Sequence, residues 1–190
     1  MSEKTFQQFM SEAASKSLAR IHQHVQGRNV GMITAHRGEN TEQENKQRNK
    51  ELEHHIRTAG YGFVKVKGRY IENHGTEHAR AVDEHSYLVI GKKGNDNGHL
   101  KGFLKKHGEK YSQDSVLHKA HDEEHANLHG TREGGFPGKG KTHNMGTFHP
   151  NRAGEYHTKM KGKRSFTFEE VESVQFVTTP TFFSREENLF

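Results

Sequence analysis

The chain has 190 residues, of which 29% are hydrophobic, with no cysteine and a formal net charge of +5. This length fits one domain, and the lack of cysteine excludes disulfide bonds and thiolate metal sites. Because globular domains are roughly 45–50% apolar, we expect a small core and much loop or partner-covered surface.

Neither a signal peptide nor a membrane span is expected. The first twenty residues are polar and amphipathic, without the apolar stretch of a signal peptide. No segment approaches the ~20 apolar residues of a membrane helix. We therefore expect a soluble protein of the cytoplasm, or of a particle assembled there, with no membrane partner.

The first elements are an amphipathic helix and a short strand. Residues 4–26 carry apolar side chains at the helical period, among them Leu18, Ile21 and Val25, and Gly27 is a natural stop. The apolar stripe is expected to pack on a core, with a partner helix or subunit contact as the alternative. Residues 31–36 are typical of a buried strand.

A second helix is predicted from a capping signal. Thr41 and Glu44 match a capping box, in which the hydroxyl accepts from a free amide and the Glu side chain reaches back. The helix should run to Ala59 and end at Gly60. Its buried side should hold Leu52, Ile56 and Ala59, and its other side chains are mostly charged.

The remaining segments predict an α+β fold: a single mixed β-sheet with the N-terminal amphipathic helix and two further helices. Three parts are expected: a core domain over 1–130, a basic Gly/Lys-rich excursion over 131–164, and closing strands with an acidic, aromatic tail over 165–190. The expected strands and the third helix are, in chain order, strands 61–71 and 83–90, helix 99–108, and strands 113–120, 125–131, 165–168 and 174–177.

Polar residues near two predicted strands form the first candidate site. His36 follows a buried strand, and Glu84 and His85 begin another. Polar groups at strand ends are a usual place for a site in α/β sheets, and a carboxylate with two imidazoles can do acid–base work. The alternative is that these side chains only bond loops and close the sheet.

Histidine spacing suggests a second candidate, a divalent metal site. His118, His121, His125 and His129 would share one face of a helix, where neutral imidazoles bind zinc or nickel. If 113–131 is a hairpin, the four side chains leave that common face. Because the chain has 17 histidines, coincidental pairs are expected, and the sequence favours no cofactor.

A Gly/Lys-rich segment resembles a phosphate-binding loop only in its letters. Residues 135–142 match G-x-x-x-x-G-K-T, but no clear strand precedes them and no apolar helix follows. A phosphate loop needs both. The segment is therefore expected to be a flexible loop.

The strongest basic segment is 131–164, with eight Lys or Arg against two Glu, whereas 165–190 has one Arg against five Glu. Aromatic residues lie between the basic ones, and such a mixture can contact phosphates and stack bases. The alternative is a solvated loop, or one paired with the acidic tail. The candidate nucleic-acid contacts are Lys139, Lys141, Arg152, Lys159, Lys161, Lys163 and Arg164.

Several segments together resemble a family of small bacterial and phage proteins of unknown function. The resemblance covers about residues 30–118, departs at residues 36–38, and the region after 130 is more similar to the phage members. It implies an α+β domain and no reaction. The segments that carry it are Met32–Ala35, Glu39–Asn40, Asn45–Leu52, Gly60–Gly62, Glu84–Ser86 and Gln113–Leu117.

The sequence leaves three hypotheses for function. The first is a non-enzymatic bacteriophage protein, accessory or virion-associated, that binds nucleic acid or a phage structural protein. The second is a metal- or His-dependent hydrolase or nuclease acting on nucleotides, with His36, Glu84 and His85 as its catalytic residues. The third is an inhibitor of a host protein. A homo-oligomer is compatible with each of them.

Overall fold

The computed structural model describes residues 18–72, 80–92, 96, 98–150, 157–159 and 165–169. A helix over residues 18–27 comes first. The elements that follow are β1 (Val30–Ile33), α2 (Glu42–Thr58), β2 (Gly62–Glu72), β3 (Arg80–Ile90), α3 (His99–Lys110), β4 (Ser115–Lys119), β5 (Ala126–Gly130), β6 (Thr142–Pro150), β7 (His157–Lys159) and β8 (Ser165–Glu169).

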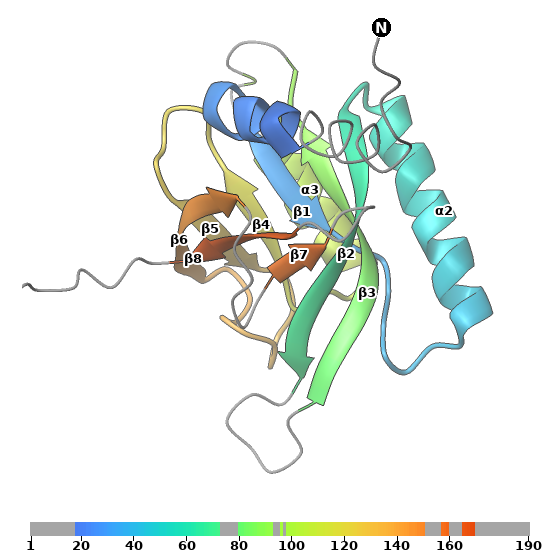
Figure 1. Ribbon diagram of the computed structural model, residues 1–190. Helices are drawn as coiled ribbons and strands as arrows, with labels where there is room; N and C mark the ends of the chain where they lie inside the picture. Colours follow the sequence, from blue (N-terminus) through green and yellow to red (C-terminus); the bar gives the residue numbers. More distant parts are fainter. Residues whose placement is uncertain are drawn as a thin grey trace, which may run out of the picture.

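The first part of the fold is a β-α-β-β-α-β unit. β1 pairs antiparallel with both β3 and β4, and β2 pairs with β3, so the strand order is β4-β1-β3-β2. Both helices pack on one face of these strands (Figure 1). This order and connectivity define the ferredoxin-like arrangement.

The later strands close this sheet into a barrel. They continue from β4 through β5, β6, β8 and β7 back to β2, and each described pair is antiparallel. The α+β class with three helices is confirmed, but the pairing is antiparallel where a mixed sheet was expected. The reason is that the strands β4 to β8 pair antiparallel with their neighbours, and among the described strands no crossover connection brings two parallel strands side by side. Residues 142–150 and 157–159, expected in an excursion, are barrel strands.

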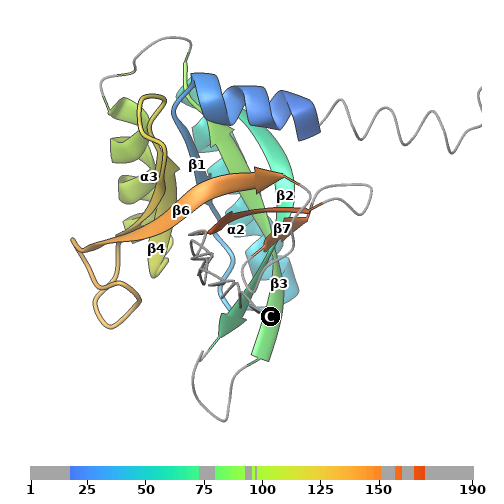
Figure 2. The ribbon, with the colours of Figure 1, turned by 60° about the vertical axis from the view of Figure 1, so that its left-hand side comes forward.

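The barrel interior is apolar and is covered at one end by the N-terminal helix. Leu18, Ile21 and Val25 of that helix are buried against side chains of the strands, as their spacing predicts. Figure 2 shows this helix lying across one end of the barrel, with β6 running across the barrel below it. The strand residues of this cluster are Val30, Val66, Leu88, Leu117, Ala126, Phe166 and Phe168.

A second apolar cluster lies between the sheet and the helices. Leu52 and Ile56 of α2 and Leu100 and Leu104 of α3 are fully buried in it. α3 approaches β1 so closely that a Cβ on Gly31 would lie 2.2 Å from Cδ1 of Leu104. Glycine is therefore required at this crossing.

The predicted capping box of α2 is confirmed. Thr41 caps the helix, its side chain accepts from the Glu44 amide, and the Glu44 carboxylate accepts from the Thr41 amide at 2.7 Å. The helix ends at Thr58, and Gly60 follows with a φ of +76°. The four amides at a helix start need such partners, which is why the signal was readable in the sequence.

Residues 113–131 form the hairpin alternative and not a helix. β4 and β5 pair antiparallel, with Val116 opposite His129 and His118 opposite Asn127. The Gly/Lys-rich segment after them is a loop that leads into strand β6, so it lacks the helix of a phosphate loop. The expected strand at 174–177 and the aromatic tail lie outside the described residues. In the part of the chain that the structure describes, no helix is long and apolar enough to cross a membrane.

Candidate functional site

A loop of seven residues, 34–40, leaves the end of β1 and enters α2. Ile33 is opposite Tyr87 in the last β1–β3 pair, and beyond it the two chains diverge. Beyond β1, the side chains of two asparagines of α2 accept the backbone hydrogen bonds that a neighbouring strand would otherwise accept. Asn49 Oδ1 accepts from the Ala35 amide at 3.0 Å, and Asn45 Oδ1 accepts from the Arg37 amide at 2.9 Å. The loop is therefore held in place at its backbone.

Two longer side chains fix the same loop from both sides. Arg48 Nε donates to the Ala35 carbonyl at 2.8 Å, and its guanidinium also donates to the Tyr111 carbonyl at 2.8 Å. Gln113 Nε2 donates to the His36 carbonyl at 2.9 Å. These bonds join the loop to the end of α3 and the start of β4, so the loop belongs to the rigid frame of the domain.

His36 and Glu84, two of the three residues of the first candidate site, lie close together in the structure. The His36 Nδ1 atom lies 3.7 Å from Oε2 of Glu84, and the two side chains are 24% and 14% exposed. Along β3, Ser86 and Leu88 lie on the barrel side, and Glu84 shares their strand face because side chains alternate. Opposite Glu84 stands Gly68 of β2, where a Cβ would lie 3.8 Å from Cγ of Glu84.

His85 does not join this pair through its side chain. It is exposed and shares the helix-facing side of β3 with Tyr87, whose hydroxyl donates to the Asn49 carbonyl at 3.0 Å. Burial raises the pKa of Tyr87 to about 12. The contribution of His85 is its carbonyl oxygen, which accepts from Thr34 Oγ1 at 2.8 Å and from Asn49 Nδ2 at 3.3 Å.

An ion-pair chain runs beside the 34–40 loop. Arg37 donates to Glu39 at 2.8 Å and to Asp114 at 3.3 Å, and Arg132 donates to Asp114 at 2.7 Å. The hydrogen bond with Glu39 raises the pKa of the Arg37 guanidinium, and the same bond lowers the pKa of Glu39. This series of ion pairs connects the loop before β6 with the loop after β1.

The four histidines of the candidate metal site do not converge. His118 and His129 lie on one sheet face with ring centroids 6.1 Å apart. His121 instead bonds Asn29, with its backbone amide 2.7 Å from Asn29 Oδ1, and His125 contacts Asn144 at 2.9 Å. Among the described residues no three His, Asp or Glu side chains are arranged to hold a metal ion. A hairpin alternates its side chains between faces, which is why the helical spacing had no meaning.

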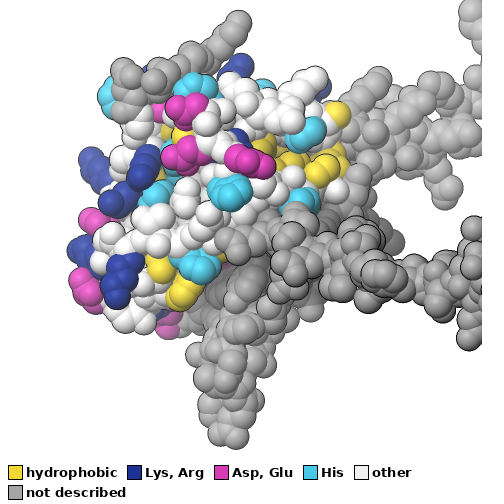
Figure 3. All heavy atoms as spheres, turned by 90° about the vertical axis from the view of Figure 1, so that its left-hand side faces the viewer, with side chains coloured by type: hydrophobic (Ala, Val, Ile, Leu, Met, Phe, Trp, Pro, Cys, Tyr) yellow, Lys and Arg dark blue, Asp and Glu magenta, His cyan; other side chains and the backbone are white. Residues whose placement is uncertain are grey.

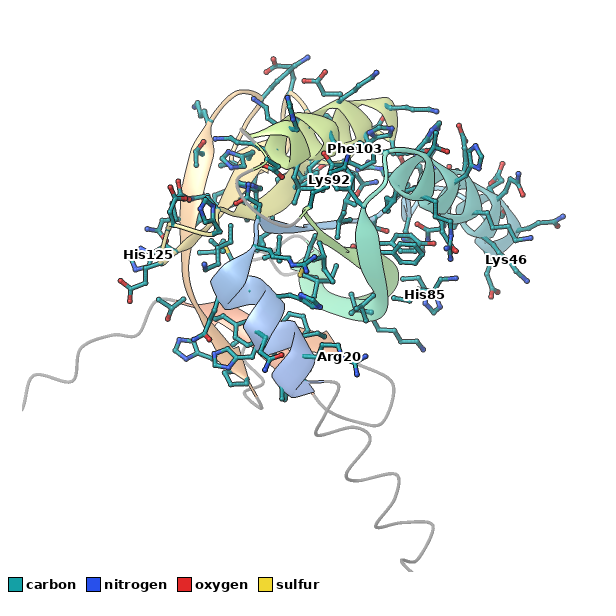
Figure 4. The ribbon with its side chains drawn as sticks, turned by 90° about the horizontal axis from the view of Figure 1, so that it is seen from above. Arg20, Lys46, His85, Lys92, Phe103 and His125 are labelled. Atoms are coloured by element: carbon teal, nitrogen blue, oxygen red, sulfur yellow. The ribbon has the colours of Figure 1, made fainter. Side chains whose placement is uncertain are left out.

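His125 belongs instead to a shallow, partly acidic hollow at the β4–β5 turn. Glu123, Glu124, His125 and Asn127 line it. Figure 3 shows carboxylates and histidines gathered on this face of the molecule. The hollow is remote from the His36–Glu84 pair, since His125 and His85, the neighbour of Glu84, lie on opposite sides of the molecule (Figure 4).

The expected nucleic-acid contacts are only partly within the described residues. Lys139 and Lys141 are exposed in the loop between β5 and β6. Lys159 lies in β7, and its side chain is outside the described part. Arg152, Lys161, Lys163 and Arg164 lie outside the described residues. Of the expected contacts, the structure therefore describes only the side chains of Lys139 and Lys141.

Sequence reasoning missed the polar side chains of α2 that brace the site. Asn45 and Asn49 are buried, at 5% and 8% exposure, on the same helix face as Leu52 and Ile56. A spacing of four, seven and eleven residues from Asn45 places all four side chains in one stripe. Two amides at buried positions of a charged helix were the signal that could have identified them, because buried amides require partners.

The fold is thus that of a ferredoxin-like unit extended into a closed barrel, with a carboxylate–imidazole pair where β1 and β3 diverge. A comparison with family models matches residues 31–177 to the S-adenosylmethionine lyase family. Since this match covers more than half of the 190 residues, the chain belongs to that family. No curated protein matches the chain.

Family membership overturns the first functional hypothesis. The expectation of a non-enzymatic virion or accessory protein that binds an anionic partner is wrong, because the family is named for an enzyme. That expectation relied on the basic net charge. Net charge affects solubility and the rate of association with charged partners, but it does not indicate which reaction a protein catalyses. The finding agrees better with the alternatives that the sequence left open, an enzyme or an inhibitor of a host protein, and it is compatible with a phage origin.

Proposed function

We propose that this chain cleaves S-adenosylmethionine without water, with Glu84 as the residue that binds the substrate. The observation that carries the proposal is the family match over residues 31–177, which includes the 34–40 loop, β3 and the His36–Glu84 pair. Substrate and reaction type both come from the family name. The roles of individual residues come from their placement.

The substrate presents two positive groups, the sulfonium and the α-ammonium, and one carboxylate. A partly buried carboxylate is suited to bind an ammonium group, since charge-assisted hydrogen bonds strengthen away from bulk water. Glu84, at 14% exposure, is such a group. The His36 imidazole lies beside it, with Nδ1 3.7 Å from Oε2.

The reaction that needs least from the protein is an internal displacement. The substrate carboxylate oxygen attacks Cγ, the Cγ–S bond breaks, and its electron pair neutralises the sulfonium. The products are homoserine lactone and 5′-methylthioadenosine, and no proton is transferred. Closing a five-membered ring within one molecule has effective molarities of about 10⁵–10⁸ M when the groups are well oriented. By binding the ammonium, Glu84 would turn the carboxylate toward Cγ.

An elimination across Cβ and Cγ is less favoured. It requires a base to remove a Cβ proton, which no adjacent group makes acidic. The internal displacement needs no base at all, and we favour it for that reason.

Product analysis in H₂¹⁸O tests the reaction. We expect 5′-methylthioadenosine together with homoserine lactone, and any homoserine formed later should carry ¹⁸O in its carboxyl group. Label in the homoserine hydroxyl would show attack of water on Cγ and would make the protein a hydrolase. Vinylglycine as product would establish elimination, and an unchanged substrate would refute the proposal.

The role of Glu84 is tested by Glu84→Gln. We expect kcat/KM to fall at least about 100-fold, because hydrogen bonds to a charged group contribute about 1.5–3 kcal/mol and this one also orients the reacting carboxylate. Glu124→Gln, at the exposed β4–β5 turn, is the matched control and should keep wild-type activity. Equal activity of the two variants would remove Glu84 from the site.

A further inference from the structure

The gap between β1 and β3 beyond Ile33 and Tyr87 is bridged by side chains instead of backbone bonds. Thr34 is 7% exposed, and its hydroxyl both donates to the His85 carbonyl at 2.8 Å and accepts from the His36 amide at 3.0 Å. One hydroxyl thus connects the residue after Glu84 to the backbone of His36.

Asn49 makes the same connection from α2. Its Oδ1 accepts from the Ala35 amide at 3.0 Å, and its Nδ2 donates to the His85 carbonyl at 3.3 Å. The His85 carbonyl therefore accepts two bonds, one from each side chain. The Tyr87 hydroxyl, which bonds the Asn49 carbonyl at 3.0 Å, fixes this turn of α2 to β3.

We infer that Thr34 and Asn49 are positioning residues that set the separation of His36 from Glu84. The inference rests on the proposed function, because Thr34 and Asn49 would position the His36–Glu84 pair at which the substrate is proposed to bind. Neither side chain needs to touch the substrate. Because each bridges the two diverging chains directly, loss of either would let His36 and Glu84 move apart while the strands beneath stay paired. A displacement of about 1 Å at a site can reduce a rate about 100-fold.

The experiment compares Thr34→Val, Thr34→Ser and Asn49→Asp in the full chain. Thr34→Val keeps the shape and removes both bonds, whereas Thr34→Ser keeps the hydroxyl. Asn49→Asp keeps the acceptor for the Ala35 amide and removes the donor to the His85 carbonyl. We expect Thr34→Val and Asn49→Asp to lower kcat about 10- to 100-fold with KM changed less than about 3-fold. Thr34→Ser should restore kcat to within about 3-fold of wild type.

A matched control separates positioning from loss of stability. Thr131 is also buried, at 3% exposure, and its hydroxyl donates to the Gln113 carbonyl at 2.6 Å. Thr131→Val removes a comparable buried bond in the loop after β5, and its melting temperature gives the cost of that loss. We expect Thr34→Val to lose far more activity than Thr131→Val at a similar melting temperature.

The outcomes distinguish the two proposals. A wild-type protein that leaves S-adenosylmethionine intact contradicts the proposed function, and the inference falls with it. An active wild type, an impaired Glu84→Gln, and a Thr34→Val variant no slower than Thr131→Val would overturn the inference alone. A Thr34→Ser variant as slow as Thr34→Val would overturn it as well, because the hydroxyl would then not matter.

Discussion

His118 and His129 are buried imidazoles on neighbouring strands that face α3. Burial lowers the pKa of both, and the nearby Lys101 lowers it further. For His129 the pKa falls to about 4, with His118 and Lys105 as further neighbours that lower it, and Thr142 Oγ1 lies 3.1 Å from its Nδ1. Protonation of either imidazole therefore opposes folding.

We predict that acid destabilises the protein through His129. Its folded-state pKa of about 4 lies below the ordinary 6.5, so the unfolded chain takes up the proton first. Stability is therefore lost as the pH falls from about 6.5 to about 4, by an amount on the order of 3 kcal/mol. Urea unfolding across this range measures it. His129→Gln should flatten the pH dependence, while a matched change at exposed His54 should leave it as in the wild type.

At the scale of elements, the contact of α3 with β1 depends on one glycine. A Cβ on Gly31 would lie 2.7 Å from the Leu117 carbonyl oxygen as well as against Leu104. The side chain of Leu104 can adjust, whereas the β4 backbone cannot. The distance between helix and sheet is thus fixed by the absence of a side chain.

We predict that Gly31→Ala lowers the free energy of unfolding by about 1–3 kcal/mol, the usual cost of overpacking. Gly102→Ala, on the exposed side of α3 with nothing within 4 Å of its Cβ, provides the opposite case. It should stabilise the protein by up to about 1 kcal/mol, because alanine is the better helix former. Denaturant melts of the two variants measure both effects. Equal shifts in the same direction would contradict the close approach.

At the scale of the whole molecule, the barrel joins the ferredoxin-like unit to the later strands through one interior. Phe166 of β8 is fully buried, and its ring centroid lies 5.2 Å from the ring centroid of Phe148 in β6. The same cluster holds the N-terminal helix. Lys119 of β4, a buried ammonium whose pKa is lowered by burial, donates to the Val25 carbonyl of that helix at 3.0 Å.

We predict that the described elements unfold as one unit. Phe166→Ala should cost about 3–5 kcal/mol, the usual loss for a buried phenylalanine. The thermal transition should stay single and shift to lower temperature as a whole. Phe136→Ala is the control, because this phenylalanine is 60% exposed, and it should change stability by less than about 0.5 kcal/mol. Two separate transitions in Phe166→Ala would show that the later strands form an independent unit.

Local signals were enough to predict most elements and part of the site. The capping box, the apolar period of α2 and the strand at 83–90 depend on neighbouring residues alone, so they could be predicted without the fold. His36 and Glu84 were predicted from their places at strand ends. Their approach to 3.7 Å could not be, because it depends on which strands are neighbours.

The sequence by itself determined the α+β class, the bounds of α2 and α3 to within two residues, and the absence of cysteine. Tertiary structure decided three things: the antiparallel closure of the barrel, the separation of the four histidines, and the bracing of the 34–40 loop by Asn45 and Asn49. The physical reason is the same in each case. Local periodicity fixes which face of an element is apolar, whereas pairing across the sheet and buried hydrogen bonds depend on residues far apart in the chain, such as Thr34 and His85.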